Sequence, residues 1–461
     1  MSDPARGAEA SVRSVIRMAL LGLLVAAPLA LGSVHRAAYV PLLVVAIASG
    51  VASWGHGHWA RAHGVSVARV PASKLLLALH GLVLLQLVPL PPQLLKVVSP
   101  GSFSFYDYVA LLPLREWRPV SVSPADTVRG LLFLTAMSCL YATAFRDFAN
   151  NRWRRRAVAT VVATALIVTV EALFQAATTD PRRIYGIWKP TWWFNVFGPY
   201  VNANHFAGYV VMAIPLALAW AASALRELRR DWGHRRIGWL ALGDATGNTS
   251  IRRLAVTLIL VLGLVAAGSR GGIMACVLAV IGVPLLSKRR RWAVAAFVVL
   301  IAGALVVLGP DSLAQQAERG FEDGRFDLWR DALRMVPDFP LFGTGMNTFG
   351  TAYARYQRIW KQTWIGEAHN EYLQLLFDLG SLGSLLGAVL VFQLLATAKR
   401  NAPTGVINAG LLGSLLASAV HALVEFNWQI PANAATFATL AGLAMQTPPG
   451  AGPLDPPSRH A

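Results

Sequence analysis

Charged residues are scarce in this chain. Only 14% of its 461 residues are Asp, Glu, Lys or Arg, whereas 55% are hydrophobic, and a soluble domain usually carries about a quarter charged residues. The two cysteines, Cys139 and Cys276, lie within apolar runs. They exclude a disulfide framework and a structural zinc site, which needs about four ligands. Alternating strands of about ten residues, typical of a membrane barrel, are also missing.

Apolar runs of the length that a membrane helix needs recur along the chain. Crossing the hydrocarbon takes roughly 20 mostly apolar residues, and a helix satisfies its own backbone polar groups in lipid. Twelve such runs begin near Val15, Ala38, Leu75, Val128, Ala157, His205, Leu254, Gly272, Trp292, Leu379, Gly405 and Ile430. The sequence therefore predicts an all-α, polytopic membrane protein of about 12 transmembrane helices.

The formal net charge of +18 is distributed unevenly. If the N-terminus is inside, most of the 41 Lys and Arg residues fall in loops on the cytoplasmic side, which is the positive-inside bias of membrane proteins. A surface for nucleic acid would instead be a continuous basic patch interleaved with aromatics. We therefore expect both termini in the cytoplasm, contact with membrane lipids and no nucleic-acid partner.

Three longer segments fall on the outer side in this topology, at residues 91–126, 178–204 and 310–378. The third is the largest, has partly helical spacing and lies between the ninth and tenth spans. A structured loop of that size is a candidate active site or binding lid. We expect the chain to divide into five parts. They are two N-terminal spans with a cytoplasmic loop (1–74), a transmembrane core (75–309), a periplasmic loop domain (310–378), C-terminal transmembrane helices (379–446) and a disordered cytoplasmic tail (447–461).

Two arginines stand near the outer ends of apolar runs. Arg270, in the string Ser269-Arg-Gly-Gly272, lies in a tight turn between two spans. A charge at this depth indicates a functional site, although an arginine that reaches to phospholipid headgroups gives the same pattern. Arg183 comes before an aromatic stretch and either binds substrate or anchors an interfacial aromatic belt. Further along, Asn202, Asn204 and His205 either cap a helix or face a bound anion.

His369 carries the most useful chemistry in the outer segments, because an unperturbed imidazole accepts a proton near neutral pH. Asn370 and Tyr372 follow it closely, and Glu367 or Glu371 could orient its ring. Helical spacing predicts that His369 shares one face with Tyr372, Leu373 and Leu376.

His421 and Glu425 lie four residues apart near the outer end of another apolar run. Residues at this spacing are neighbours on a helix. We expect the pair to share one helical face, where it either forms an internal salt bridge with a structural role, which we favour, or takes part in function.

Five strings, in this order, resemble the O-antigen ligase and polymerase superfamily, and most of all its exopolysaccharide-associated branch. They occupy residues 197–208, 268–272, 341–345, 368–374 and 425–431. All five lie on the outer side of the predicted topology. The resemblance covers roughly residues 75–445.

The resemblance implies a glycosyltransferase of the bacterial inner membrane that takes a glycan from undecaprenyl diphosphate and passes it to a lipid A–core or growing-polysaccharide acceptor. The reaction is expected at the periplasmic face, inverting, and without metal or cofactor. His369 matches the family's loop histidine and Arg270 its short-turn arginine. Arg325 matches the arginine that opens the large loop's helix, and Arg183 matches another family arginine, with Arg182 equally available. An arginine fork suits a diphosphate, and a base must take the acceptor proton.

A lipid-linked oligosaccharide flippase or another transporter is the alternative. Such a protein would carry polar or charged residues along midplane helices and often repeat symmetry, whereas the ionisable residues here gather at the outer ends of the runs. The sequence leaves open whether the transferase is a ligase, a polymerase or a protein O-glycosyltransferase.

Overall fold

The computed structural model describes residues 3–110, 115–178, 180, 182–190, 195–232, 245–286, 324–359 and 363–446. Within these ranges the regular elements are helices, and extended pairing is limited to isolated bridges such as Leu90–Arg118. The helices are α1 (Asp3–Leu29), α2 (Arg36–Ala62), α3 (Ser73–Gln86), α4 (Pro92–Val98), α5 (Pro100–Ala110), α6 (Pro124–Asp147), α7 (Asn151–Ala176), α8 (Ala203–Trp232), α10 (Ala245–Ala266), α11 (Arg270–Leu286), α13 (Arg325–Ala332), α14 (Phe349–Tyr353), α15 (Glu371–Asn401), α16 (Val406–His421) and α17 (Pro431–Ala444), with 3-10 turns at Leu31–Ser33, Leu333–Met335 and Ala402–Thr404.

Seven of the described helices are long and apolar enough to cross a membrane, and three shorter apolar helices accompany them. The prediction of an all-helical, multi-pass membrane protein is thereby confirmed, while the number of twelve spans stays a prediction. The run that begins near Trp292, the first part of the 310–378 segment and the tail at 447–461 lie outside the described residues.

Helix α8 forms the centre of the bundle and is the most deeply buried of the seven candidate spans. Its neighbour α16 presents glycines to it, so the two backbones approach closely: a Cβ on Gly413 would lie 2.7 Å from Cβ of Pro215, and one on Gly410 would lie 2.9 Å from Cβ of Ala219. Small residues at such contacts are typical of membrane helices. Because α16 is fixed to α8, the turn that follows α16 is held beside the N-terminal end of α8.

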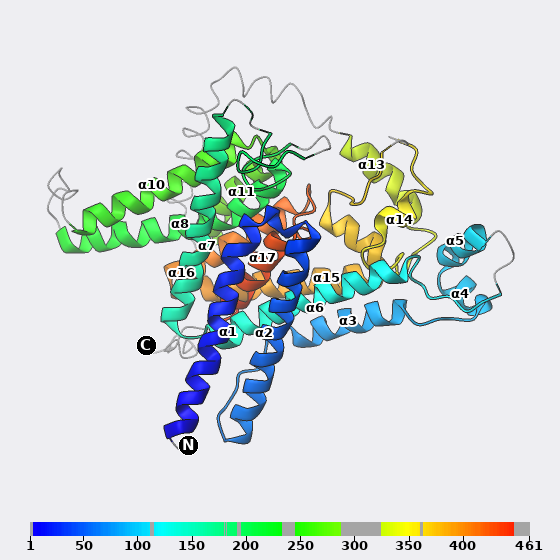
Figure 1. Ribbon diagram of the computed structural model, residues 1–461, viewed down its shortest axis with the longest axis horizontal. Coiled ribbons are helices and arrows are strands. Elements are labelled where there is room, and N and C mark those ends of the chain that lie inside the picture. Colours follow the sequence, from blue (N-terminus) through cyan, green and yellow to red (C-terminus); the bar gives the residue numbers. More distant parts are fainter. Residues whose placement is uncertain are drawn as a thin grey trace, which may run out of the picture.

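The predicted outer segments at 91–126 and 310–378 pack against each other. Gly101 at the start of α5 donates its amide to the carbonyl of Asp338 at 2.9 Å, and the amide of Val122 donates to the carbonyl of Thr344 at 2.8 Å. Figure 1 shows α4, α5, α13 and α14 together on one side of the bundle, away from the far ends of α8 and α10. The two segments therefore pack as one unit, and their side of the membrane stays a prediction.

Helix α15 is broken at Gly380, whose φ of 65° and ψ of −166° lie outside helical values. The string Leu341–Gly345 packs directly against the break. The amide of Thr344 donates to the carbonyl of Phe377, and the amide of Ser381 donates to the carbonyl of Pro340. A Cβ on Gly380 would lie 2.4 Å from the carbonyl oxygen of Leu341. Glycine therefore allows both the break and the close approach.

Candidate functional site

Glu425 is the centre of the site. Helix α16 ends at His421, and Glu425 follows in the turn before α17 with its side chain 1% exposed. One carboxylate oxygen accepts a hydrogen bond from Nη2 of Arg325 at 2.9 Å. The other lies 3.0 Å from Nδ1 of His369. A single buried carboxylate therefore joins two predicted site residues that come from separate parts of the third outer segment.

His369 is placed by the residues that follow it. Asn370 is the N-cap of α15, and its side-chain oxygen accepts from the amides of Tyr372 and Leu373. The backbone of His369 has a φ of 50°, so the residue lies in a left-handed turn before the helix. The prediction that His369 shares a helical face with Tyr372 is therefore wrong, because α15 begins two residues later, at Glu371.

The charge state of Glu425 follows from its neighbours. Burial by itself would raise its pKa, but the hydrogen bond from His369 and the charges of His369 and Arg325 outweigh burial and lower the pKa to about 2. The group is thus a carboxylate at neutral pH and can only accept hydrogen bonds. Nδ1 of a neutral His369 must then carry the ring proton, which leaves the lone pair on Nε2.

Arg325 opens α13 as predicted and lies on the protein side of the site. Its guanidinium also donates to the carbonyl of Val424, and its side chain is 20% exposed. A second link joins α13 to the histidine segment, since the indole N–H of Trp329 donates to the carbonyl of Ala368 at 2.7 Å. These contacts direct the fork of Arg325 toward Glu425 and the Val424 carbonyl.

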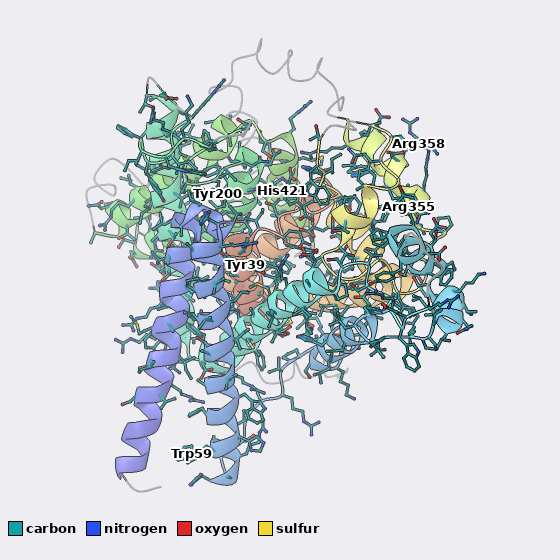
Figure 2. The ribbon with its side chains drawn as sticks, turned by 45° about the vertical axis from the view of Figure 1, so that its right-hand side comes forward. Tyr39, Trp59, Tyr200, Arg355, Arg358 and His421 are labelled. Carbon is teal, nitrogen blue, oxygen red and sulfur yellow. The ribbon has the colours of Figure 1, made fainter. Side chains whose placement is uncertain are left out.

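Arg270 is the first residue of α11 and is exposed. The next residue packs against the turn after α16: a Cβ on Gly271 would lie 2.6 Å from Cγ2 of Val424 and 3.4 Å from Nε2 of His421. The arginine turn and the Glu425 turn are therefore in direct contact. Figure 2 shows His421 among the helices of the bundle interior.

His205 lies on the other side of the same turn. Its ring is 5% exposed, and neither ring nitrogen has a hydrogen-bond partner among the described residues. The rings of His205 and His369 each meet Phe426 edge-on, with centroids 4.7 Å away. Phe426 therefore lies between the two histidines, and His205 is a buried polar group whose ordinary partners are missing.

The remaining predicted substrate-binding residues have structural contacts. Asn202 rather than Asn204 caps α8, because its side chain accepts from the amide of Asn204 at 2.8 Å. The hydroxyl of Tyr372 donates to the carbonyl of Ala419 at 2.9 Å. Arg183 pairs with Asp180 at 3.0 Å, and no hydrogen bond or ion pair of the described residues joins it to His369, Arg325 or Glu425.

Two expectations about carboxylates are wrong. Glu425 does not share a helical face with His421, because α16 ends at His421, and His421 instead contacts the side chain of Asn427 at 3.1 Å. The residue that orients His369 is Glu425, whereas Glu371 accepts from Trp428 and Gln429 in the loop before α17. In the sequence, Glu425 was marked only by its position in the string at residues 425–431, which resembles the superfamily.

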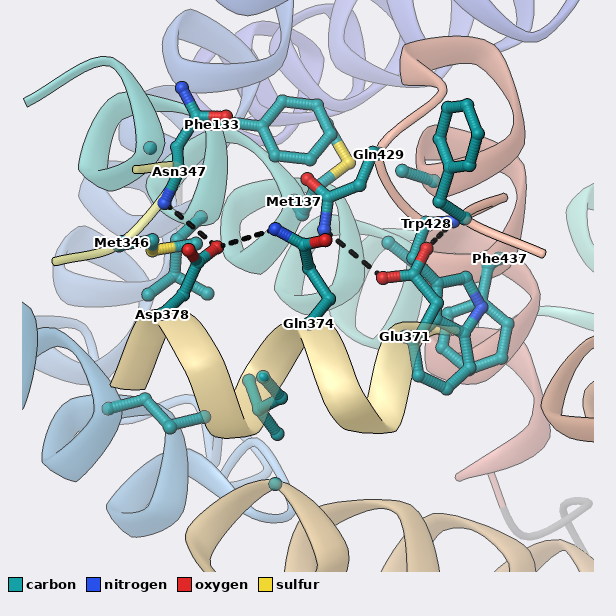
Figure 3. A pocket seen from close by; sticks show the side chains of 18 of the residues that line it. Phe133, Met137, Met346, Asn347, Glu371, Gln374, Asp378, Trp428, Gln429 and Phe437 are labelled. Atoms are coloured by element: carbon teal, nitrogen blue, oxygen red, sulfur yellow. Dashed lines mark hydrogen bonds between the residues drawn. The ribbon is translucent and has the colours of Figure 1, made fainter. Parts of the chain in front are cut away.

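A cavity of about 570 Å³ adjoins this cluster. Its walls come mainly from α6, α15 and α17, and Phe426 lies on its border. Figure 3 shows Glu371, Gln374 and Asp378 in a row on the face of α15 that lines the cavity, with apolar side chains such as Phe133, Met137 and Phe437 around them.

Residues 255–388 match a family model described as O-antigen ligase. The matched range contains Arg270, Arg325 and His369, while His205 and Glu425 lie outside it. That family consists of glycosyltransferase-type enzymes, so the predicted superfamily is confirmed, and the exopolysaccharide branch stays a prediction. A search of the curated proteins found no match.

Proposed function

The chain carries an O-antigen ligase domain at residues 255–388, and from this premise we propose that it transfers a glycan from undecaprenyl diphosphate to an acceptor hydroxyl at the periplasmic face of the bacterial inner membrane. The observation that carries the proposal is the buried carboxylate of Glu425, which holds both His369 and Arg325. A histidine oriented by a carboxylate is the usual arrangement for a general base.

In the proposed reaction, Nε2 of His369 takes the proton of the acceptor hydroxyl. The acceptor oxygen then attacks the anomeric carbon from the face opposite the diphosphate. The bond between that carbon and the diphosphate oxygen breaks, and the bonding electron pair stays on the leaving diphosphate. The configuration at the anomeric carbon is inverted. Glu425 is a positioning residue, because it acts through the tautomer and the charge of His369.

Arg270 is the group that we assign to the diphosphate. It is exposed at the N-terminal end of α11, where the helix dipole also favours an anion, and its turn contacts the turn of Glu425. Arg325 supports the site from the protein side through Glu425. The unpartnered ring of His205 and the exposed Arg183 are proposed as further substrate contacts, and Asn204, Asn370 and Tyr372 shape the surrounding backbone. The twelve-span topology with cytoplasmic termini belongs to the same proposal.

The test is glycan transfer by purified protein in liposomes. His369→Ala should lower the rate by about 10²–10⁴-fold, which is the usual worth of a general base, and should leave donor binding within about twofold. His63→Ala is a matched control, because His63 is an exposed C-cap residue of α2. Full activity in His369→Ala would remove the residue from the mechanism. Donor flipping without transfer in the wild type would favour the transporter alternative.

A further inference from the structure

The cavity beside the Glu425 cluster has two chemically different kinds of side chain in its lining. The apolar set, which we call the shaft, includes Phe133, Met137, Leu390, Leu394, Phe437 and Ala441. The polar set, which we call the collar, consists of Glu367, Glu371, Gln374, Asp378, Asn347 and Gln429. A lining that offers both apolar and polar groups suits an amphiphile, since each part of the ligand meets groups of its own kind.

The cavity is elongated along α6. Its lining residues on this helix run from Arg129 to Tyr141, and twelve helical rises of about 1.5 Å each extend about 18 Å. That is more than half of the hydrocarbon thickness of roughly 30 Å. The cavity is therefore long enough for a single apolar chain that lies alongside the helices.

Two carboxylates of the collar are fully engaged by the fold. Asp378 accepts from the amides of Asn347, Thr348 and Phe349 and from the side chain of Gln374. Glu371 accepts from Trp428 and Gln429. They hold the collar in shape, and their hydrogen-bond partners do not come from a ligand.

Glu367 differs from these two. It lines the cavity, and none of the hydrogen bonds or ion pairs of the described residues uses its carboxyl group. Burial raises the pKa of Glu367 well above its ordinary value, and Asp378 and Glu371 raise it further. A carboxyl group accepts hydrogen bonds in either protonation state, and a sugar hydroxyl donates one.

The charges of the collar select against an anionic head. Three carboxyl groups line it, and the one arginine among the described residues of the cavity, Arg129, is paired with Asp126. A phosphate placed there would be repelled by the carboxylate of Asp378. The cationic groups that suit a diphosphate, Arg270 and Arg325, belong to the neighbouring turns around Glu425.

We propose that this cavity is a second lipid site, which binds an amphiphile with one apolar chain in the shaft and an uncharged, hydroxyl-rich head against Glu367. The head would lie beside His369, because the flanking residues Glu367, Glu371 and Tyr372 all line the cavity. The role of the amphiphile as the acceptor rests on the proposed function. Its binding in the cavity does not depend on that function.

Photolabelling of the full-length protein in nanodiscs tests the binding. The probe is an alkyl glucoside with a diazirine at the end of its chain, and labelled peptides are identified by mass spectrometry. Label should appear in α6, α15 and α17, and unlabelled dodecyl glucoside should reduce it at least about fivefold. Dodecyl phosphate at the same concentration should reduce it less than about twofold. Equal competition by dodecyl phosphate would overturn the proposed selectivity, and label spread evenly over lipid-facing helices would overturn the site.

Variants of the shaft and the collar sharpen the test. Ala438→Trp fills the shaft and should lower labelling about tenfold, and Met137→Trp serves if Ala438→Trp does not fold. Ala266→Trp, at an exposed position of α10 outside the cavity, should leave labelling unchanged. Glu367→Gln keeps a donor and an acceptor and should retain labelling within about twofold, whereas Glu367→Leu should weaken it about fivefold or more, as the loss of one or two hydrogen bonds predicts. Unchanged labelling in both Trp variants of the cavity would contradict the proposal.

The two proposals can fail separately. His369→Ala should abolish transfer and leave photolabelling intact. If the wild type shows no transfer but the cavity is labelled and blocked as described, the proposed function fails and the lipid site stands. If Ala438→Trp loses labelling but transfers at the wild-type rate, the assignment of the amphiphile as the acceptor fails, and the lipid site stands without that role.

Discussion

Glu425 lies 3.0 Å from Nδ1 of His369 although 56 residues separate the two in the chain. Its other oxygen holds Arg325, a further 44 residues upstream of His369 in the sequence. The turn after α16 thus collects groups from both ends of the described part of the third outer segment. This geometry selects the tautomer of a neutral imidazole in which Nδ1 carries the proton and Nε2 the lone pair.

Glu425→Gln tests that role. The amide keeps the volume but loses the charge that favours Nδ1 protonation and the imidazolium form, so transfer should fall about 10²-fold, within the range of general-base catalysis. Glu425→Asp should recover part of the activity, and its pH–rate profile should resemble the wild type more than that of Glu425→Gln does. Glu227→Gln, at an exposed position of α8, is the control. Equal rates in wild type and Glu425→Gln would reduce Glu425 to a structural anchor.

The pH dependence of stability follows from the same carboxylate. Its folded-state pKa of about 2 lies below the ordinary value of 4.5. The pair therefore contributes stability that is fully present above the ordinary pKa and is lost as the pH falls toward 2. Thermal unfolding in detergent should show wild type more stable than Glu425→Gln by a constant margin above pH 5, with the margin shrinking below pH 4. A margin that is unchanged between pH 6 and pH 3 would contradict this assignment.

The sequence predicts the helices well because the membrane imposes them. Each span must be apolar over its length, so the runs that begin near Val128 and Ala157 are found as α6 and α7. His369 and Arg270 were also accessible, because short strings around them resemble a known superfamily, and Arg325 was matched by its place at the start of the large loop's helix. The string at Leu341–Gly345 has a physical reason of its own, since it fits against the break in α15 at Gly380.

The role of Glu425 was not predictable from spacing. A separation of four residues implies contact only inside a helix, and no glycine or proline marks the end of α16 at His421. The partners of Glu425 are distant in sequence, so no local pattern reports them. The same limit applies to the cap of α8, because Asn202 and Asn204 are both asparagines and either could cap a helix, and only the structure selects Asn202.

A glycine in α8 tests how tightly the site is packed. A Cβ on Gly208 would lie 1.9 Å from Oδ1 of Asn427, and Asn427 contacts both His421 and Asn433. Gly208→Ala should therefore destabilise the protein by about 1–3 kcal/mol, as overpacking does, and should reduce transfer. In Gly55→Ala the new methyl group meets nothing within 4 Å, so stability should stay equal or rise slightly. Equal melting temperatures for the two variants would contradict the close approach.

Cysteine accessibility tests the topology. Ala149, between α6 and α7, and Ala354, just after α14, are both exposed. In a background of Cys139→Ala and Cys276→Ala, we expect Ala354→Cys to react with a membrane-impermeant maleimide in intact spheroplasts. Ala149→Cys should react only after permeabilisation. The reason is the excess of Lys and Arg on the cytoplasmic side. Labelling of both positions in intact spheroplasts would refute the predicted orientation.

The last prediction concerns the arginine at the N-terminal end of α11. Arg270→Lys keeps the positive charge but loses the planar fork that binds two phosphate oxygens together. We expect transfer to fall about tenfold, mainly through a higher KM for the donor, and Arg270→Ala to be weaker still. Arg330→Lys is the matched control, because Arg330 is 74% exposed on α13 and pairs with Asp327 within its own helix.

The comparison of Arg270→Lys with Arg270→Ala separates the two readings of this residue. An arginine that only anchors the protein to phospholipid headgroups would be replaced well by lysine, whose ammonium group also reaches the interface. An arginine that binds the diphosphate would be replaced poorly by lysine, because the substitution keeps the charge and loses the planar geometry of the hydrogen-bond donors. The measurement is donor KM and kcat at fixed acceptor concentration in liposomes. If both variants transfer at the wild-type rate with unchanged KM, Arg270 is a headgroup anchor, and Arg325 and Arg183 become the groups to test against the diphosphate.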